Sequence, residues 1–131
     1  MNVRKSTLRL FTIGAIVAAA AVCSSTAAFA GVGVSTSGAF LTCNTYNDGN
    51  GSGHADCTLT DTAADSHSVY AVMQADAYPS VRYNNAGGHG TSRSFTYSFG
   101  TDTPQWDFYY KVCRDIQFGF DNCSGWVHIV A

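Results

Sequence analysis

The most regular pattern in the chain is an alternation of aromatic and small polar residues over residues 94–99. Phe95, Tyr97 and Phe99 point to one side of this segment when it is extended, and serine and threonine point to the other. Such alternation predicts an antiparallel strand with one buried and one solvated face. Residues 106–113 alternate in the same way and predict the following strand.

The rest of the chain contains shorter runs of strand-forming residues, bounded by glycine, asparagine and aspartate. After residue 30, β-branched and aromatic residues dominate, and strong helix formers other than alanine are scarce. Turn signals at regular short intervals are typical of an all-β antiparallel sandwich. We therefore expect about eight strands, with room for one helical turn at 63–65, and with the shorter strands at residues 32–35, 40–46, 57–62, 68–75, 80–83 and 126–130.

The inward-facing positions of these strands predict one hydrophobic core between two layers. Its expected members are Leu41, Val72, Phe95, Tyr97, Phe99, Trp106, Phe108, Tyr110, Val112, Val127 and Ile129. The inner face of the last strand is ambiguous, because Trp126, His128 and Val130 alternate with two of these residues.

Residues 31–38 carry only two valines as apolar anchors. Two valines bury too little area to offset the backbone entropy of eight residues, so we expect this segment to be mobile unless main-chain bonds tie it into a sheet. A free segment of this kind can add to the edge of a partner's sheet. The alternative is an untethered terminus of no consequence.

The first thirty residues have the pattern of a secretory signal peptide. Three basic residues lie among the first nine positions, an apolar run follows at 10–22, and residues 28–30 read Ala-Phe-Ala. Cleavage is expected before Gly31, which leaves residues 31–131 as one secreted β-sandwich domain. The alternative, a lipoprotein acylated at Cys23, lacks the small residue and the leucine that usually precede such a cysteine.

Charge after residue 30 excludes two classes of partner. Four basic residues against nine aspartates leave this part of the chain with a net charge of −5. So few cations cannot form a nucleic-acid-binding face. The negative charge also opposes binding to an anionic membrane once the signal peptide is removed.

The cysteines after residue 30 are Cys43, Cys57, Cys113 and Cys123. An even number in a short exported chain is typical of a disulfide framework, and zinc-type spacing is missing. Four cysteines allow three pairings. Short sequence separation favours 43–57 and 113–123, because each pair brackets a predicted hairpin.

Residues 110–115 (Tyr-Lys-Val-Cys-Arg-Asp) and 121–127 (Asp-Asn-Cys-Ser-Gly-Trp-Val) resemble the last hairpin of immunoglobulin-like and fibronectin III-like sandwiches. With a cysteine on each side of the loop, the segment is also similar to small exported proteins of streptomycetes and other actinobacteria. In size and predicted export the chain is also similar to small secreted streptomycete proteins that serve as adaptor subunits of umbrella toxin particles, although no motif of theirs is matched residue by residue. The resemblance covers only this hairpin and implies an immunoglobulin-like or fibronectin III-like β-sandwich.

A second resemblance concerns the first cysteine pair. Leu-Thr-Cys at 41–43, followed by Gly53, His54 and Cys57, resembles the first disulfide region of streptomycete subtilisin inhibitors. The chain departs from that family after this region, because its last two cysteines enclose only nine residues and no Cys-Pro reactive segment is present. Protease inhibition is therefore an alternative function.

Residues 48–53 fit the beginning of a calcium-binding loop. Asp48, Asn50 and Ser52 alternate with glycines, as do the oxygen ligands of such loops, and Asp56 would add a further carboxylate. The position of the usual bidentate glutamate is occupied by Leu59. The alternative, which we favour, is a glycine-rich turn that closes a hairpin, so no cofactor is expected.

The histidines give little indication of catalysis. His54, His67, His89 and His128 lie in polar or glycine-rich surroundings, and the chain contains no nucleophile-elbow motif of the kind that serine hydrolases carry. A small secreted hydrolase is therefore the least supported alternative.

The tyrosines are the last candidate feature. Tyr78, Arg82, Tyr83 and Asn84 form the best candidate binding patch, because tyrosine with small polar neighbours is typical of recognition surfaces. The alternative is that such rings close the ends of the sandwich. We expect a secreted, non-enzymatic binding or adaptor module that recognises an extracellular protein or a surface glycan.

Overall fold

The computed structural model describes residues 31–76, 78–100 and 107–130. The predicted signal peptide and Trp106 lie outside them. The described residues form no helix, and residues 63–65, where we expected room for a helical turn, are an irregular loop. The nine strands are β1 (Val32–Thr36), β2 (Ala39–Asn47), β3 (Ser52–Asp61), β4 (Val69–Ala75), β5 (Val81–Asn85), β6 (Ser92–Gly100), β7 (Asp107–Arg114), β8 (Asn122–Cys123) and β9 (Val127–Val130).

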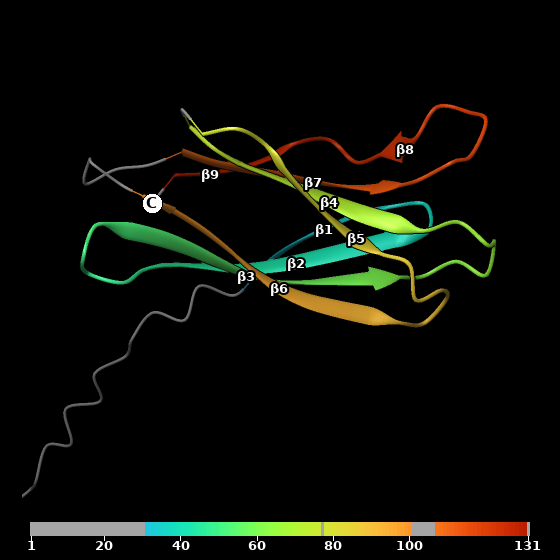
Figure 1. Cartoon of the computed structure of the whole chain (residues 1–131), viewed down its shortest axis with the longest axis horizontal. Coiled ribbons are helices and arrows are strands. Elements are labelled where there is room, and N and C mark those ends of the chain that lie inside the picture. The colour runs from blue at the N-terminus through green and yellow to red at the C-terminus, as the bar shows by residue number, and fades with distance from the viewer. Residues whose placement is uncertain (1–30, 77, 101–106, 131) are drawn as a thin grey trace, which may run out of the picture.

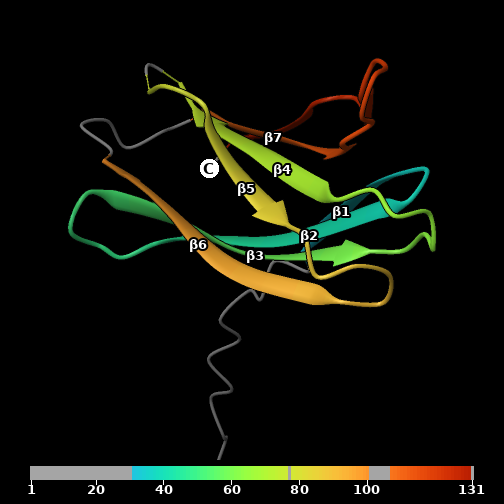
Figure 2. The ribbon, with the colours of Figure 1, turned by 45° about the vertical axis from the view of Figure 1, so that its right-hand side comes forward.

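The strands form two antiparallel sheets, which Figures 1 and 2 show as two stacked layers. Sheet A has the order β1-β2-β3-β6. Sheet B has the order β5-β4-β7, with β8 and β9 both paired to β7. The chain passes from sheet A to sheet B after β3, returns after β5 and crosses again after β6. The predicted antiparallel sandwich, of the immunoglobulin or fibronectin III kind, is confirmed.

The core between the sheets is largely the predicted one. Phe99 and Phe108 stack across the two sheets with ring centroids 5.7 Å apart, and Tyr97 lies beside both. Strict alternation placed these rings inside because neighbouring side chains of a strand face opposite sides of its sheet. The buried residues from the predicted set are Leu41, Tyr97, Phe99, Phe108, Tyr110 and Val112, while Phe95, Val127 and Ile129 are partly buried against them.

Val72 was assigned to the wrong face of its strand. β4 turns Val69, Ala71 and Met73 into the core, and Val72 lies on the outer face of sheet B. Apolar residues occupy both faces of β4, so the pattern along this strand did not distinguish the inner face from the outer one.

Both predicted disulfides are confirmed. Cys43–Cys57 joins β2 to β3, and Cys113–Cys123 joins β7 to β8. In each pair the cysteines lie directly opposite one another, with Cα atoms 4.1 and 4.0 Å apart, as expected for facing residues of neighbouring antiparallel strands. Each disulfide therefore strengthens one sheet, and neither connects sheet A to sheet B.

Residues 31–38 meet the stated exception to the predicted mobility, because main-chain bonds tie the segment into sheet A. β1 pairs with β2 along its whole length, from Val32 opposite Cys43 to Thr36 opposite Ala39. The hydroxyl of Tyr110 in sheet B donates a hydrogen bond to the backbone oxygen of Val32 (2.7 Å). Val34 packs against the core. β1 is therefore a structural edge strand.

Candidate functional site

The most exposed large apolar side chains in the described residues lie on the β7–β8 connection, residues 115–121, which we call the aromatic loop. Phe118 is 107% exposed and Phe120 is 99% exposed. Single exposed apolar residues are ordinary, but two fully exposed aromatic rings within three residues form an apolar surface that typically marks an interaction site.

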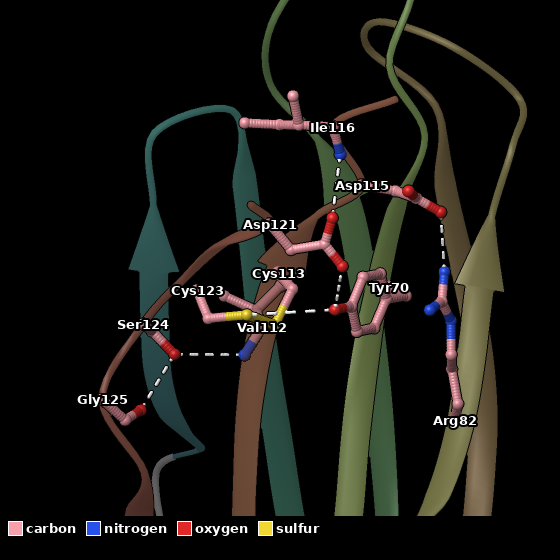
Figure 3. Close-up of a disulfide and its surroundings, with 10 residues drawn as sticks. All are labelled: Tyr70, Arg82, Val112, Cys113, Asp115, Ile116, Asp121, Cys123, Ser124 and Gly125. Atoms are coloured by element: carbon pink, nitrogen blue, oxygen red, sulfur yellow. Dashed lines mark hydrogen bonds and ion pairs between the residues drawn. A yellow bond between two sulfur atoms is a disulfide. The ribbon is translucent and has the colours of Figure 1, made fainter. Parts of the chain in front are cut away.

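The base of the aromatic loop is held to the body of sheet B (Figure 3). The Cys113–Cys123 disulfide closes it. The hydroxyl of Tyr70 in β4 donates a hydrogen bond to Oδ2 of Asp121 (2.6 Å), and Oδ1 of Asp121 accepts one from the backbone nitrogen of Ile116 (3.0 Å). One carboxylate therefore connects both ends of the loop to the neighbouring strand.

A second contact holds the first residue of the loop. The Arg82 guanidinium in β5 donates to Oδ2 of Asp115 at 2.8 Å and lies over the Tyr70 ring, 3.5 Å from its centroid. The backbone nitrogen of Asp115 donates to the Ser68 oxygen (2.9 Å). The aromatic loop is thus ordered before any partner binds. This order reduces the conformational entropy that is lost on binding.

The tip of the aromatic loop is a tight turn with a strained residue. The backbone nitrogen of Gly119 donates to the Ile116 oxygen (3.3 Å), and Phe118 has φ = 64°. This left-handed conformation ordinarily belongs to glycine, and a bulky residue in it costs on the order of 1–3 kcal/mol. The Phe118 ring is fully exposed, so it does not recover that cost within the fold.

The hydrogen bond between Tyr70 and Asp121 shifts the pKa values of both groups. Burial raises the pKa of Tyr70 to about 12, and the hydrogen bond to Asp121 adds to this rise. The same bond, followed by the bond from the Ile116 backbone, lowers the pKa of Asp121 below its usual value. The neutral phenol and the ionised carboxylate are therefore the stable pair at neutral pH.

We expect alkaline pH to weaken the fold partly through Tyr70. The pKa of this phenol is about 12 in the folded state against 10.0 for the free group, so its contribution to stability is complete below pH 10 and is lost as the pH rises to 12. Urea denaturation at a series of pH values should show a smaller loss for Tyr70→Phe than for the wild type. Some loss remains in the variant, because burial also raises the pKa of Tyr110 to about 12. Identical losses in the two proteins would contradict this assignment.

The four residues of the predicted tyrosine patch do not form one surface. Arg82 and Asn84 lie together on the outer face of β5, where Arg82 Nε donates to Asn84 Oδ1 (2.7 Å). Tyr83 points inward and stacks on Phe95, with ring centroids 4.0 Å apart. Tyr78 is exposed in the β4–β5 connection, at the other end of the sandwich from the aromatic loop (Figure 1). Arg82 alone contributes to the site described here.

The predicted calcium loop is the turn between β2 and β3. Asp48 Oδ1 accepts hydrogen bonds from the backbone nitrogens of Asn50 (2.7 Å) and Ser52 (3.2 Å), and these bonds lower the pKa of Asp48. Asp56 lies four residues along β3 from Ser52 at the end of this turn, which is roughly 13 Å along the strand. Its carboxylate accepts a hydrogen bond from the Thr96 hydroxyl. The described residues contain no group of three His, Cys, Asp or Glu side chains placed to hold a metal ion. The Asp48 carboxylate is therefore engaged by its own turn.

A Ser–His–Asp arrangement that sequence reasoning missed lies on the outer face of sheet A. Ser98 Oγ is 2.9 Å from His54 Nδ1, and His54 Nε2 is 3.5 Å from Asp48 Oδ2. His54 and Ser98 are directly opposite in the β3–β6 ladder. The same ladder carries three more side-chain hydrogen bonds, between Asp56 and Thr96, Thr58 and Ser94, and Thr60 and Ser92. The arrangement is therefore one rung of a row of polar cross-strand pairs, which stabilise sheets of this kind.

Fold and site together define a β-sandwich that is cross-linked within each sheet and presents one braced aromatic loop. No family model, no curated protein and no solved structure matches the chain. No helix that could cross a membrane occurs in the part of the chain that the structure describes. The residues of the site come from four strands and the aromatic loop, and among them Arg82 and the paired Cys113 and Cys123 were sequence-based candidates. The missed signal was the Phe-Gly-Phe sequence at 118–120, inside a loop closed by two cysteines.

Proposed function

We propose that this protein is an exported, non-enzymatic binding module that captures an extracellular protein with its aromatic loop. The observation that supports the proposal is the complete exposure of Phe118 and Phe120 on a loop that a disulfide, an ion pair and two side-chain hydrogen bonds hold in place. A partner with an apolar pocket buries both rings without having to order the loop first.

We expect the two phenylalanine rings to contribute most of the binding free energy. Burying one phenylalanine ring contributes about 1.5–3 kcal/mol. Aromatic anchors of this kind at the centre of an interface usually account for most of its affinity. Tyr70, Arg82 and the disulfide order the loop before binding, so the entropic cost of association is smaller.

Export is inferred from the disulfides, and a protein partner is inferred from the apolar side chains of the loop. Two disulfides are typical of proteins in oxidising compartments outside the cytosol. Phe118 and Phe120 carry no polar side-chain atoms, whereas glycan recognition requires hydrogen-bonding groups placed beside the rings. A protein with an apolar pocket therefore suits this loop better than a sugar does.

The test is capture by the purified, immobilised protein from the medium of the producing cells. The variant Phe118→Ser with Phe120→Ser should retain at least tenfold less of the captured protein, because two anchors of 1.4 kcal/mol or more each are lost. Phe40→Ser is the matched control, since Phe40 is 40% exposed on the outer face of sheet A. Capture that survives in the double variant, or that falls equally in the control, would contradict the proposal.

Protease inhibition is the second candidate, because an exposed, braced loop between two cysteines is also what a protease inhibitor presents. The geometry of the tip favours the first proposal. An inhibitor loop that pairs with the edge of a protease sheet has to be extended, as are other peptides that add to a sheet edge. Residues 116–119 form a tight turn instead. Titration of subtilisin with the protein in a peptide-cleavage assay separates the two functions. Stoichiometric loss of protease activity that disappears in the double phenylalanine variant would establish inhibition instead.

A further inference from the structure

The outer face of sheet A carries an open cavity of about 370 Å³, a volume in the usual range of sites for small ligands. Its rim consists of polar side chains from β2, β3 and β6, namely Asn44, Asp56, Thr58, Ser94 and Thr96. Cys57 and Phe95 also line it, and because their side chains lie in or against the core, they contribute their backbone to its floor. Figure 2 shows sheet B on one side of sheet A and no described strand on the other, so a ligand can reach the cavity.

The polar groups of the rim bond to one another but keep part of their hydrogen-bonding capacity. Asp56 Oδ1 accepts a hydrogen bond from the Thr96 hydroxyl (2.6 Å), and the Thr58 and Ser94 hydroxyls share one (3.3 Å). One hydroxyl donates in such a pair, and the other keeps its proton for a ligand. The Asn44 amide makes no hydrogen bond within the part of the chain that the structure describes. The rim therefore offers both donors and acceptors.

An aromatic ring borders the cavity. Tyr46 follows Asn44 by two residues on the outer face of β2 and is 46% exposed. Its ring stacks on His54, with ring centroids 5.1 Å apart, and the rest of the ring is open to solvent. Partial burial raises the pKa of the Tyr46 phenol, and the neighbouring Asp56 carboxylate raises it further. The ring therefore lies close to the part of the rim that Asp56 forms.

The charges on this face favour an uncharged ligand. The described strands of sheet A place no lysine or arginine on the outer face, because Arg93 in β6 donates to the backbone oxygen of Asn84 in sheet B. Asp56 is the one carboxylate among the lining residues. A phosphate, sulfate or carboxylate ligand would meet this negative charge without a cation to offset it.

We infer that this cavity and the Tyr46 ring bind a neutral oligosaccharide. Sugar hydroxyls both donate and accept hydrogen bonds, and the C–H side of a sugar ring can pack against an aromatic ring. The Asp56 carboxylate would form the strongest of these bonds, because charged acceptors bind hydroxyls more tightly than neutral ones. Hydrogen-bonding groups beside a ring are what the aromatic loop lacks. The inference goes beyond the proposed function, since it concerns a separate surface on the other sheet.

The test follows the backbone amide signals of Cys57, Thr58, Phe95 and Thr96 by NMR while neutral trisaccharides are added. The probes are cellotriose, triacetylchitotriose, maltotriose and β-1,4-mannotriose. At least one of them should shift these signals in a saturable way at concentrations up to about 10 mM. Trigalacturonate, a trisaccharide with three carboxylates, should bind at least tenfold more weakly than the best neutral probe. No saturable shift with any neutral probe, or equal binding of trigalacturonate, would overturn the inference.

Two variants locate the site. Tyr46→Ala removes the ring, and Asp56→Asn removes the charge but keeps an oxygen for the Thr96 hydroxyl. Each should weaken binding of the best neutral probe at least tenfold. Asp76→Asn makes the same change of charge at an exposed position in the β4–β5 connection of sheet B and should alter binding less than twofold. Undiminished binding in both site variants would overturn the inference. If either variant does not fold, the comparison of neutral and anionic probes on the wild type still decides the question.

The outcome is separable from that of the proposed function. The double phenylalanine variant should bind the best neutral probe as the wild type does. Absence of sugar binding, together with loss of protein capture in the double phenylalanine variant, overturns this inference and leaves the proposed function standing. Sugar binding that depends on Tyr46 and Asp56, together with undiminished capture by the double phenylalanine variant, overturns the proposed function and supports this inference.

Discussion

Replacing Cys113 and Cys123 together by alanine is expected to lower the free energy of unfolding by about 2–5 kcal/mol. In a domain of this size that corresponds to a fall of roughly 10–25 °C in melting temperature. The disulfide joins β7 to β8 across ten positions of sequence, and its loss frees the unfolded chain from a closed loop. Cys113 is also fully buried, so its replacement leaves a small cavity. Thermal denaturation followed by circular dichroism measures the effect.

The same substitution should reduce partner capture, since the disulfide closes the base of the aromatic loop. Replacing Cys43 and Cys57 by alanine is the matched control. That disulfide is also a cross-strand bond, with a sequence separation of 14, so the loss of stability should be similar. It lies in sheet A, away from the loop, and capture below the melting temperature should be retained. An equal loss of capture in both variants would show that the Cys113–Cys123 bond acts only through global stability.

Deleting residues 31–38 is expected to destabilise the protein by at least about 3 kcal/mol, or more than roughly 10 °C in melting temperature. The deletion removes the ladder between β1 and β2, the partly buried Val34 side chain and the acceptor of the Tyr110 hydrogen bond. It also uncovers β2 at its edge. Guanidinium denaturation of the shortened and the full protein gives the difference.

The smaller variant Tyr110→Phe isolates one part of this effect. It keeps the buried ring and removes only the hydroxyl that reaches the Val32 oxygen, so a loss of about 1 kcal/mol is expected. If the deletion leaves the melting temperature unchanged, then β1 is a mobile segment and its pairing with β2 does not contribute to the fold.

Strands with strict alternation were predicted correctly because their two faces differ chemically. At residues 94–99 and 107–112 the inner face is aromatic or aliphatic and the outer face is mostly polar. A slip of one residue would bury the polar set, so the orientation is fixed by the pattern itself. β4 offered no such contrast, and Val72 was placed inside although the core lies against Ala71 and Met73.

The candidate site was less predictable, because its residues are close in space and distant in sequence. Tyr70, Arg82 and Asp121 come from β4, β5 and the aromatic loop and meet only when β4 lies between β5 and β7. Two neighbours in the predicted tyrosine patch, Arg82 and Tyr83, are separated for a local reason. Alternation along β5 turned Tyr83 toward Phe95 and left Arg82 on the outer face.

Composition and local pattern were sufficient for the β class, the two cross-strand disulfides and most of the core. Each of these depends on neighbours within about fifteen residues or on the two-residue period of a strand. The exposure of Phe118 and Phe120, and the contacts of Tyr70 and Arg82 with the aromatic loop, depended on the packing of distant segments. A phenylalanine has the same tendency to be buried wherever it occurs, and the arrangement of the surrounding strands determines whether anything is there to cover it.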